Sequence, residues 1–352
     1  MKSVKSKHIL RIICYLGVIL VAFGVAYFGI GLFVHPQKGI LVNAQPVAKD
    51  ESKEAISLVA LGDSLTEGVG DTTERGGFVP LVATEVKDYF KLNAIDTENF
   101  GKSGDRSDQI LKRLKKSEEQ QTALTTADIV TITVGGNDLM KTVSANLFGK
   151  LSLNTFMTPA SKYQRQLTDL IAEIRQYAPS APIYIFGIYN PFYLYFSEIT
   201  ELQEIVNYWN GKTEEVVDSA TDCFFLPIND LLYKGSQGDQ AVEDENSEDE
   251  GLTMDSSAAT ASTETTSTTS GTTETTESTT ESQVKGTLAS SDAAALEAAL
   301  GGLVSTSGSA NDLIFDEDHF HPNNLGYQKM AGVLRDELIQ TQGLWLKDDG
   351  AK

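Results

Sequence analysis

Short apolar runs alternate with stretches of helical periodicity from about residue 55 to residue 340, and this alternation restricts the chain to few folds. Strands that alternate with helices predict right-handed β–α–β crossovers and a mostly parallel sheet covered on both faces, which is an α/β fold. Ligands of such folds bind beyond the carboxyl ends of the strands. The predicted strands are Ile56–Leu61, Ala94–Phe100, Ile129–Val134, Pro182–Gly187 and Cys223–Ile228.

Apolar residues at helical spacing predict the helices between these strands. They are Phe78–Leu92, a helix near Ser107–Lys116, a helix marked by Tyr163–Ile174, Ile199–Val217 and Asn323–Gln340. Leu139–Pro159 and Tyr189–Phe196 are expected to be loops that line a substrate pocket. Five aromatic residues of the second loop suggest either a pocket wall or ordinary packing: Tyr189, Phe192, Tyr193, Tyr195 and Phe196.

The segment from about Gly235 to Gly308 does not fit this architecture, because it is rich in Ser, Thr, Glu and Asp. Such a composition cannot bury enough apolar surface to offset the entropy of ordering, so most of the segment is predicted to be disordered. Folded residues follow it, so both of its ends must return to the fold. We therefore interpret it as an insertion into one domain that spans Ala55–Trp345, and a glycosylated or wall-spanning spacer is the alternative.

The N-terminus predicts a membrane anchor. Ile12–Val34 is free of charge and long enough to cross a hydrocarbon core of about 30 Å. The preceding segment Met1–Arg11 carries four cationic side chains, which places it in the cytoplasm by the positive-inside rule. Residues His35–Glu54 then form a stalk, and the domain lies outside. The alternative is a signal peptide cleaved near Val42–Ala44, which would release a secreted protein.

Charge and cysteine content exclude several classes of protein. The formal net charge of −21 argues against nucleic acid as a partner, because binding a phosphate backbone needs a basic surface. Cys14 lies in the predicted anchor and Cys223 in a predicted strand, so the outer domain cannot form an internal disulfide. No spacing of cysteine or histidine suggests structural zinc, and no cofactor is expected.

Ser64 follows the first predicted strand in the sequence Gly62-Asp63-Ser64-Leu65, which exposes its hydroxyl at the mouth of the sheet. A serine needs a base to become a nucleophile. In the predicted domain the only histidines are His319 and His321, in a loop with several carboxylates that could orient an imidazole. A solvated acidic loop, or a metal site built from these histidines and acids, would be the alternatives.

Two further strand ends offer hydrogen-bond donors for an oxyanion. A turn that contains Gly104 follows the second strand and can present a backbone N–H. Gly135, Gly136 and Asn137 follow the third strand, where the Asn137 amide can donate. Each turn alone would be an ordinary β-to-α connection. Together with the serine and the late histidine they indicate a hydrolase site.

In these blocks the chain resembles the SGNH hydrolases, also called the GDSL family of lipases and acylhydrolases. The resemblance covers roughly Ile56–Gln340 and implies a flavodoxin-like three-layer α/β/α sandwich without a required metal. It implies Ser64 as nucleophile and His321 as base. It implies Asp318 as the acid that orients the base, because Pro322 selects this Asp-x-x-His frame over Asp316 and His319. The implied oxyanion donors are the N–H groups of Ser64 and Gly104 and the Asn137 amide.

The sequence thus predicts an extracytoplasmic serine ester hydrolase that works through an acyl-serine. Its substrate is expected to be a small-molecule, lipid or glycan ester. An O-acetylesterase that acts on cell-wall or exogenous glycans is one alternative, and a cell-surface binding protein without turnover is another. Oligomeric state does not follow from the sequence.

Overall fold

The computed structural model describes residues 52–146, 152–191, 193, 200–236 and 311–348, all within the compact unit Gln45–Lys352. Five parallel strands form one sheet in the order β2-β1-β3-β4-β5, the flavodoxin-like order. The predicted α/β fold is confirmed. The strands are β1 (Ala55–Gly62), β2 (Ala94–Gly101), β3 (Ile129–Thr133), β4 (Ile183–Phe186) and β5 (Cys223–Leu226).

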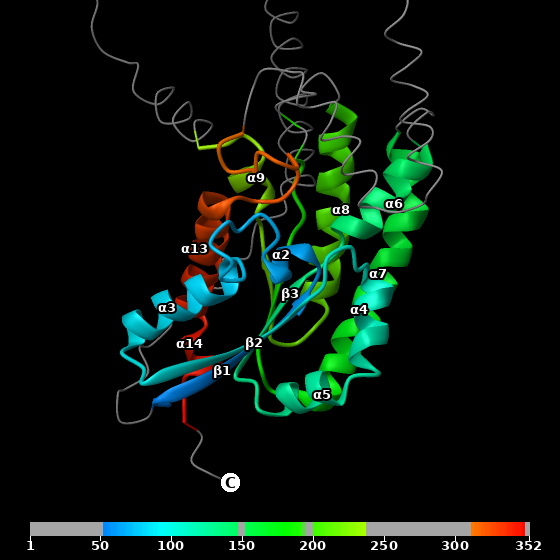
Figure 1. The fold of residues 1–352 in the computed structure, drawn as a ribbon. Coiled ribbons are helices and arrows are strands. Elements are labelled where there is room, and N and C mark those ends of the chain that lie inside the picture. Colours follow the sequence, from blue (N-terminus) through cyan, green and yellow to red (C-terminus); the bar gives the residue numbers. More distant parts are fainter. Residues whose placement is uncertain (1–51, 147–151, 192, 194–199, 237–310, 349–352) are drawn as a thin grey trace, which may run out of the picture. The chain divides into compact units, whose positions relative to one another are not determined.

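Helices cover both faces of this sheet, which gives three layers (Figure 1). One layer holds α4 (Ser107–Leu114), α5 (Glu118–Thr125), α6 (Gly136–Asn146), α7 (Leu153–Tyr177) and α8 (Thr200–Asp218). The other holds α3 (Phe78–Phe90), α9 (Asn229–Leu232), α13 (Asn324–Gln340) and α14 (Gln342–Trp345). The short helix α2 (Ser64–Glu67) begins directly beyond β1.

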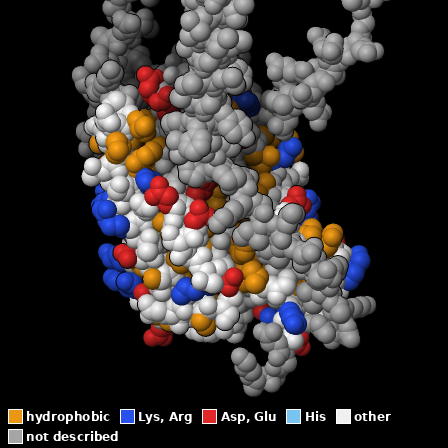
Figure 2. Space-filling view, turned by 180° about the vertical axis from the view of Figure 1, so that it is seen from behind, with side chains coloured by type: hydrophobic (Ala, Val, Ile, Leu, Met, Phe, Trp, Pro, Cys, Tyr) orange, Lys and Arg blue, Asp and Glu red, His pale blue; other side chains and the backbone are white. Residues whose placement is uncertain are grey.

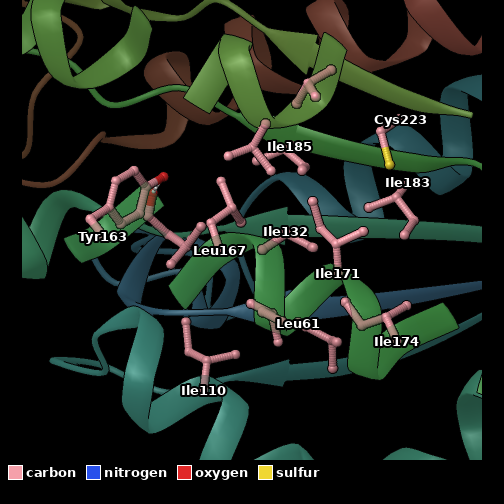
Figure 3. Close-up of a cluster of buried hydrophobic side chains, with 14 of the residues drawn as sticks. Leu61, Ile110, Ile132, Tyr163, Leu167, Ile171, Ile174, Ile183, Ile185 and Cys223 are labelled. Carbon is pink, nitrogen blue, oxygen red and sulfur yellow. Dashed lines mark hydrogen bonds between the residues drawn. The ribbon is translucent and has the colours of Figure 1, made fainter. Parts of the chain in front are cut away.

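The alternation of side chains along the strands divides the core between the two faces. Leu61, Ile132 and Ile185 point to the α7 face, where they meet Leu167 and Ile171 (Figure 3). Their neighbours along the strands point to the opposite face and pack on α3 and α13. The central strand β3 is fully buried, as its β-branched run predicts for a parallel sheet.

Leu139–Pro159 is not a loop, contrary to the expectation from its sequence. Its described parts belong to α6 and to the start of α7, which continues through Pro159. Proline lacks an N–H and interrupts helical hydrogen bonding at a cost of about 3 kcal/mol. Phe156 and Ala160 on either side of it are fully buried, so tertiary packing favours the helix despite the proline.

The two ends of the predicted insertion lie together. The Ser236 N–H donates to the Asp312 carboxylate at 2.8 Å, and the Asn311 amide donates to the Leu232 carbonyl at 2.7 Å. The chain therefore leaves and re-enters the domain at one place. The segment between them, with the helix considered near Ala293–Leu300, lies outside the described residues.

The described structure begins inside the predicted stalk. Ser52 forms a bridge with Lys347, and the Lys53 N–H donates to the Leu346 carbonyl at 2.8 Å. These residues therefore pair with the end of the domain. Of the described helices, none is both long and apolar enough to cross a bilayer; the predicted span Ile12–Val34 lies outside the described residues.

The surface seen in Figure 2 carries hydrophobic side chains in separate groups among Lys, Arg, Asp and Glu, wherever grey atoms do not cover it. The most exposed large apolar side chains of the described residues come from different elements: Tyr89, Met157, Leu325 and Leu344. Single exposed apolar residues are normal on a soluble surface. They do not mark a binding face.

Candidate active site

Ser64 lies at the carboxyl edge of the sheet, next to the point where the strand order reverses between β1 and β3. The hydroxyl is held by the backbone, because Ser64 is the first residue of α2 and Asp63 caps that helix by accepting from the Leu65 N–H at 3.1 Å. Ser64 is only 5% exposed. The Oγ atom is therefore fixed at the bottom of a surface opening.

Asp63 is anchored to β3 below the serine. Its carboxylate accepts from the Thr133 hydroxyl at 2.7 Å, and the Thr133 and Thr66 hydroxyls are 2.8 Å apart. All three side chains are buried. Burial raises the pKa of Asp63 above its usual value, and the hydrogen bonds from Thr133 and from the Leu65 N–H only partly oppose this. This polar cluster fixes the turn from β1 into α2.

His321 contacts Ser64 across 257 residues of sequence, with 2.8 Å between Nε2 and the Ser64 Oγ. Its Nδ1 lies 2.7 Å from the Asp318 carboxylate. The other Asp318 oxygen accepts from the Phe320 and His321 backbone N–H groups at 2.8 and 3.0 Å. The structure thus brings the three predicted triad residues into one hydrogen-bonded chain.

The surroundings of Asp318 favour its ionised form, which can accept a hydrogen bond from His321. Partial burial alone would raise its pKa, but the hydrogen bond and charge of His321 and the two backbone N–H groups outweigh that effect and lower the pKa. An ionised Asp318 carboxylate can accept a hydrogen bond from an Nδ1–H group, and in that tautomer the Nε2 that faces the Ser64 hydroxyl carries no proton. This tautomer is the one that a general base requires.

The other Asp-x-x-His pair, Asp316 and His319, has a different environment. Asp316 is exposed, and His319 adopts a left-handed backbone conformation with φ of 54°. The His319 N–H donates to the Phe315 carbonyl, which closes the loop, and the Phe315 N–H donates to the His321 carbonyl. Of the two imidazoles, the one in hydrogen-bonding contact with Ser64 is that of His321.

Of the predicted oxyanion donors, Asn137 lines the same pocket as Ser64. Asn137 is the second residue of α6 and is 4% exposed, and its Nδ2 donates to the Asp105 carbonyl at 3.0 Å. An amide nitrogen has two hydrogens, so the second remains to serve a substrate. Gly104 lies in the turn before Asp105 with φ of 79°, a conformation that favours glycine.

An apolar pocket adjoins Ser64 and Asn137. Most of its lining side chains follow β1, β3 and β4, and one comes from the loop that carries His319 and His321, which we call the histidine loop. The lining side chains are Leu65, Val134, Ile188, Tyr189, Pro191 and Phe320. The Tyr189 hydroxyl also donates to the Phe320 carbonyl at 2.6 Å, which braces the histidine loop. Within the suggested aromatic wall, Tyr193 instead contacts the Tyr233 ring, and Phe192, Tyr195 and Phe196 lie outside the described residues.

Among the described residues, no group of three or more histidine, cysteine or acidic side chains is arranged to hold a metal ion. The carboxylate nearest to the His321 ring is already engaged in hydrogen bonds with that ring and with the backbone.

A family model for the GDSL-like lipase/acylhydrolase family matches residues 60–251, which is more than half of the 352 residues. The chain belongs to this family. It is therefore an ester-hydrolysing enzyme of the GDSL type. The matched region holds the blocks around Ser64, Gly104 and Asn137, whereas the histidine loop lies beyond it.

Individual relatives agree with the family. The chain is 33% identical over 202 residues to the protein YpmR of Bacillus subtilis, covering 57% of this chain and 78% of YpmR. It is 28% identical over 142 residues to the spore germination lipase LipC of Bacillus licheniformis, covering 39% of this chain and 65% of LipC. The crystal structure of the lipase Lip_vut3 from a goat rumen metagenome shares the fold, with a TM-score of 0.50 at 19% identity over 80% of this chain and 96% of that one.

Arg113 is the residue of this region that sequence analysis missed. It sits near the end of α4 and reaches under the turns that carry Ser64 and Gly104. It follows another cation at the end of an ordinary amphipathic helix, so no pattern in the sequence marks it.

Proposed function

We propose that this GDSL-type enzyme hydrolyses carboxylic esters through an acyl-serine intermediate on Ser64, with His321 as general base and Asp318 as the group that orients it. One observation carries the proposal: the hydrogen-bonded chain from the Asp318 carboxylate through the His321 ring to the Ser64 hydroxyl, with steps of 2.7 and 2.8 Å. Both distances are those of direct proton-transfer partners.

In the first half-reaction, the unprotonated Nε2 of His321 takes the Ser64 proton while Oγ forms a bond to the ester carbonyl carbon. The resulting imidazolium is stabilised by the ionised Asp318 carboxylate. When the tetrahedral intermediate collapses, the carbon–oxygen bond to the alcohol breaks and Nε2 returns the proton to the leaving oxygen. The products of this half are an alcohol and an acyl-Ser64 ester.

The second half-reaction repeats the sequence with water. Nε2 of His321 accepts a proton from a water molecule as its oxygen attacks the acyl carbon. The second tetrahedral intermediate releases Ser64 Oγ, which recovers the proton, and the carboxylic acid leaves. One ester and one water are consumed, and the enzyme returns to its starting protonation state.

The oxyanion of both intermediates is proposed to accept hydrogen bonds from the Ser64 and Gly104 N–H groups and the Asn137 amide. The first N–H groups of a helix have no carbonyl partner within the helix, and Ser64 is the first residue of α2. A hydrogen bond from the Asn137 amide to the Asp105 carbonyl fixes the position of the Asn137 side chain. A fixed donor of this kind contributes roughly 10²–10³ in rate.

The substrate is proposed to be an ester with an apolar acyl group. The pocket beside Ser64 presents mainly apolar side chains, and a lipase, LipC, is among the relatives.

The charge-free run Ile12–Val34 behind four cationic residues supports attachment to a membrane with the domain outside the cytoplasm. Externally added protease should then digest the domain in intact cells that express the full-length protein, whereas protection of the domain would contradict this location.

The test of the mechanism uses the full-length protein and p-nitrophenyl esters of increasing acyl length. Ser64→Ala should abolish both turnover and labelling by a fluorophosphonate probe, and mass spectrometry of wild type quenched with a slow ester should show the acyl group on Ser64. Ser103→Ala is the matched control, since Ser103 is an exposed serine of a neighbouring turn. Wild-type turnover by Ser64→Ala would refute the mechanism.

A further inference from the structure

Arg113 gathers the ends of two strands and one loop with a single guanidinium. Its Nη2 donates to the Gly62 carbonyl at 3.0 Å and its Nη1 to the Phe100 carbonyl at 2.6 Å. Its Nε donates to the Asp105 carboxylate at 2.9 Å, in an ion pair whose side chains are 21% and 9% exposed. One side chain therefore binds three acceptors from three separate segments.

Each of these acceptors adjoins a proposed oxyanion donor. Gly62 precedes Ser64 by two residues at the end of β1. Phe100 and Asp105 bracket the turn that contains Gly104. The carbonyl of Asp105 is also the acceptor that holds the Asn137 amide.

We propose that Arg113 is a positioning residue that sets the spacing of the three oxyanion donors, an inference that rests on the proposed function. The Gly62 carbonyl also accepts from the Lys102 N–H at 3.1 Å, so Arg113 adds a second hydrogen bond where the pairing of β1 with β2 ends. A planar guanidinium with five N–H groups can bind several acceptors at fixed angles, whereas an ammonium is a compact point charge on a flexible stem. Arg113 touches no reacting atom and acts only through the segments it binds.

The chain supplies a matched comparison in Arg175 on α7. Its guanidinium donates to four carbonyls, those of Ala178, Ala181, Thr221 and Asp222. These precede β4 and β5, so Arg175 binds the amino edge of the sheet, opposite to the site. Arg113 and Arg175 therefore make similar hydrogen bonds, and only Arg113 makes them next to Ser64.

The experiment compares Arg113→Lys and Arg113→Ala with Arg175→Lys and Arg175→Ala in the full-length protein. Arg113→Lys should lower kcat about 10–100-fold with KM within about threefold, because donors aimed at the oxyanion act in the transition state. Affinity for a trifluoromethyl ketone, which forms a tetrahedral adduct with the serine, should fall by the same factor as kcat/KM. The Arg175 variants should lose thermal stability while kcat of the folded enzyme is unchanged.

Guanidinium at a non-denaturing concentration should restore part of the kcat of Arg113→Ala, and potassium chloride at equal ionic strength should not. The inference is overturned if Arg113→Lys keeps wild-type kcat, or if the two lysine variants lose kcat equally. Ser64→Ala, run in parallel, separates the two claims. Full activity of Ser64→Ala would refute the proposed function itself. An inactive Ser64→Ala together with a fully active Arg113→Lys would refute only the proposed role of Arg113.

Discussion

Gly62→Ala is the substitution for which the structure gives the sharpest expectation. A Cβ at this position would lie 2.8 Å from the Thr133 carbonyl oxygen, and closer still to the hydroxyls of Thr133 and Thr66. These neighbours cannot retreat easily. Both threonines are fully buried, their hydroxyls are hydrogen-bonded to each other, and Thr133 also donates to Asp63.

Two costs add up. Inserting a methyl group into a packed site costs about 1–3 kcal/mol in strain. Displacing the Thr133 hydroxyl leaves a buried polar partner unsatisfied, which costs about 1–3 kcal/mol more. A total of about 2–6 kcal/mol corresponds to a fall in Tm of about 5–20 °C for a domain of this size. Because Gly62 precedes the nucleophile by two residues, the surviving folded enzyme should also lose kcat.

The assay measures Tm together with esterase kcat and the fraction of enzyme labelled by a fluorophosphonate. Gly211→Ala is the control, since a Cβ there meets nothing within 4 Å and the position lies inside α8. It should keep wild-type activity and gain up to about 1 kcal/mol, because alanine favours a helix over glycine. A Gly62→Ala enzyme with wild-type Tm and turnover would show that the turn between β1 and α2 is far more compliant than its contacts indicate.

His321→Ala should reduce kcat by about 10³-fold or more because the proposed base is lost, whereas His319→Ala should retain most activity. Ester hydrolysis by both variants shows which histidine acts as the base, and the opposite ranking would assign that role to His319. Asp138 has its pKa raised to about 6, chiefly by burial. The stability that it contributes should be complete below about pH 4 and lost as pH rises through 6. Relative to wild type, Asp138→Asn should thus gain up to about 3 kcal/mol between pH 4 and 7, and Tm curves parallel over that range would contradict this. Replacing residues 237–310 by a short Gly/Ser linker should leave kcat and KM within about twofold, because the flanking residues already meet at Asp312, and loss of folding would refute that reading.

Four of the five strands were predictable because each is a short apolar run with a turn after it, whereas β2 is a largely polar edge strand. Every predicted strand lies within two residues of its observed ends. Helix α7 was predicted too short. Its sequence shows clear helical spacing only from Tyr163 onward, and Pro159 reads as a break. What extends the helix back to Leu153 is burial of Phe156 in the hydrophobic core, a tertiary effect that no local pattern reports.

The candidate site likewise contains residues that the sequence predicts and supporting groups that it does not. Ser64, His321 and Asn137 could be singled out because each follows a strand or stands in a distinctive loop, and because the chain has only four histidines. The groups that hold them could not. Arg113 and the brace from Tyr189 to the histidine loop work through backbone carbonyls, and a carbonyl is present at every position, so the sequence carries no trace of which ones are used.

The contact between Ser64 and His321 also has a consequence for when this enzyme becomes active. The nucleophile emerges early from the ribosome, but its partner imidazole follows 257 residues later, after the inserted segment. A growing chain that has already folded β1 to β5 still lacks the proposed base and helix α13, which packs on α3. With His321 as the proposed base, ester hydrolysis should begin only after nearly the whole chain has been synthesised.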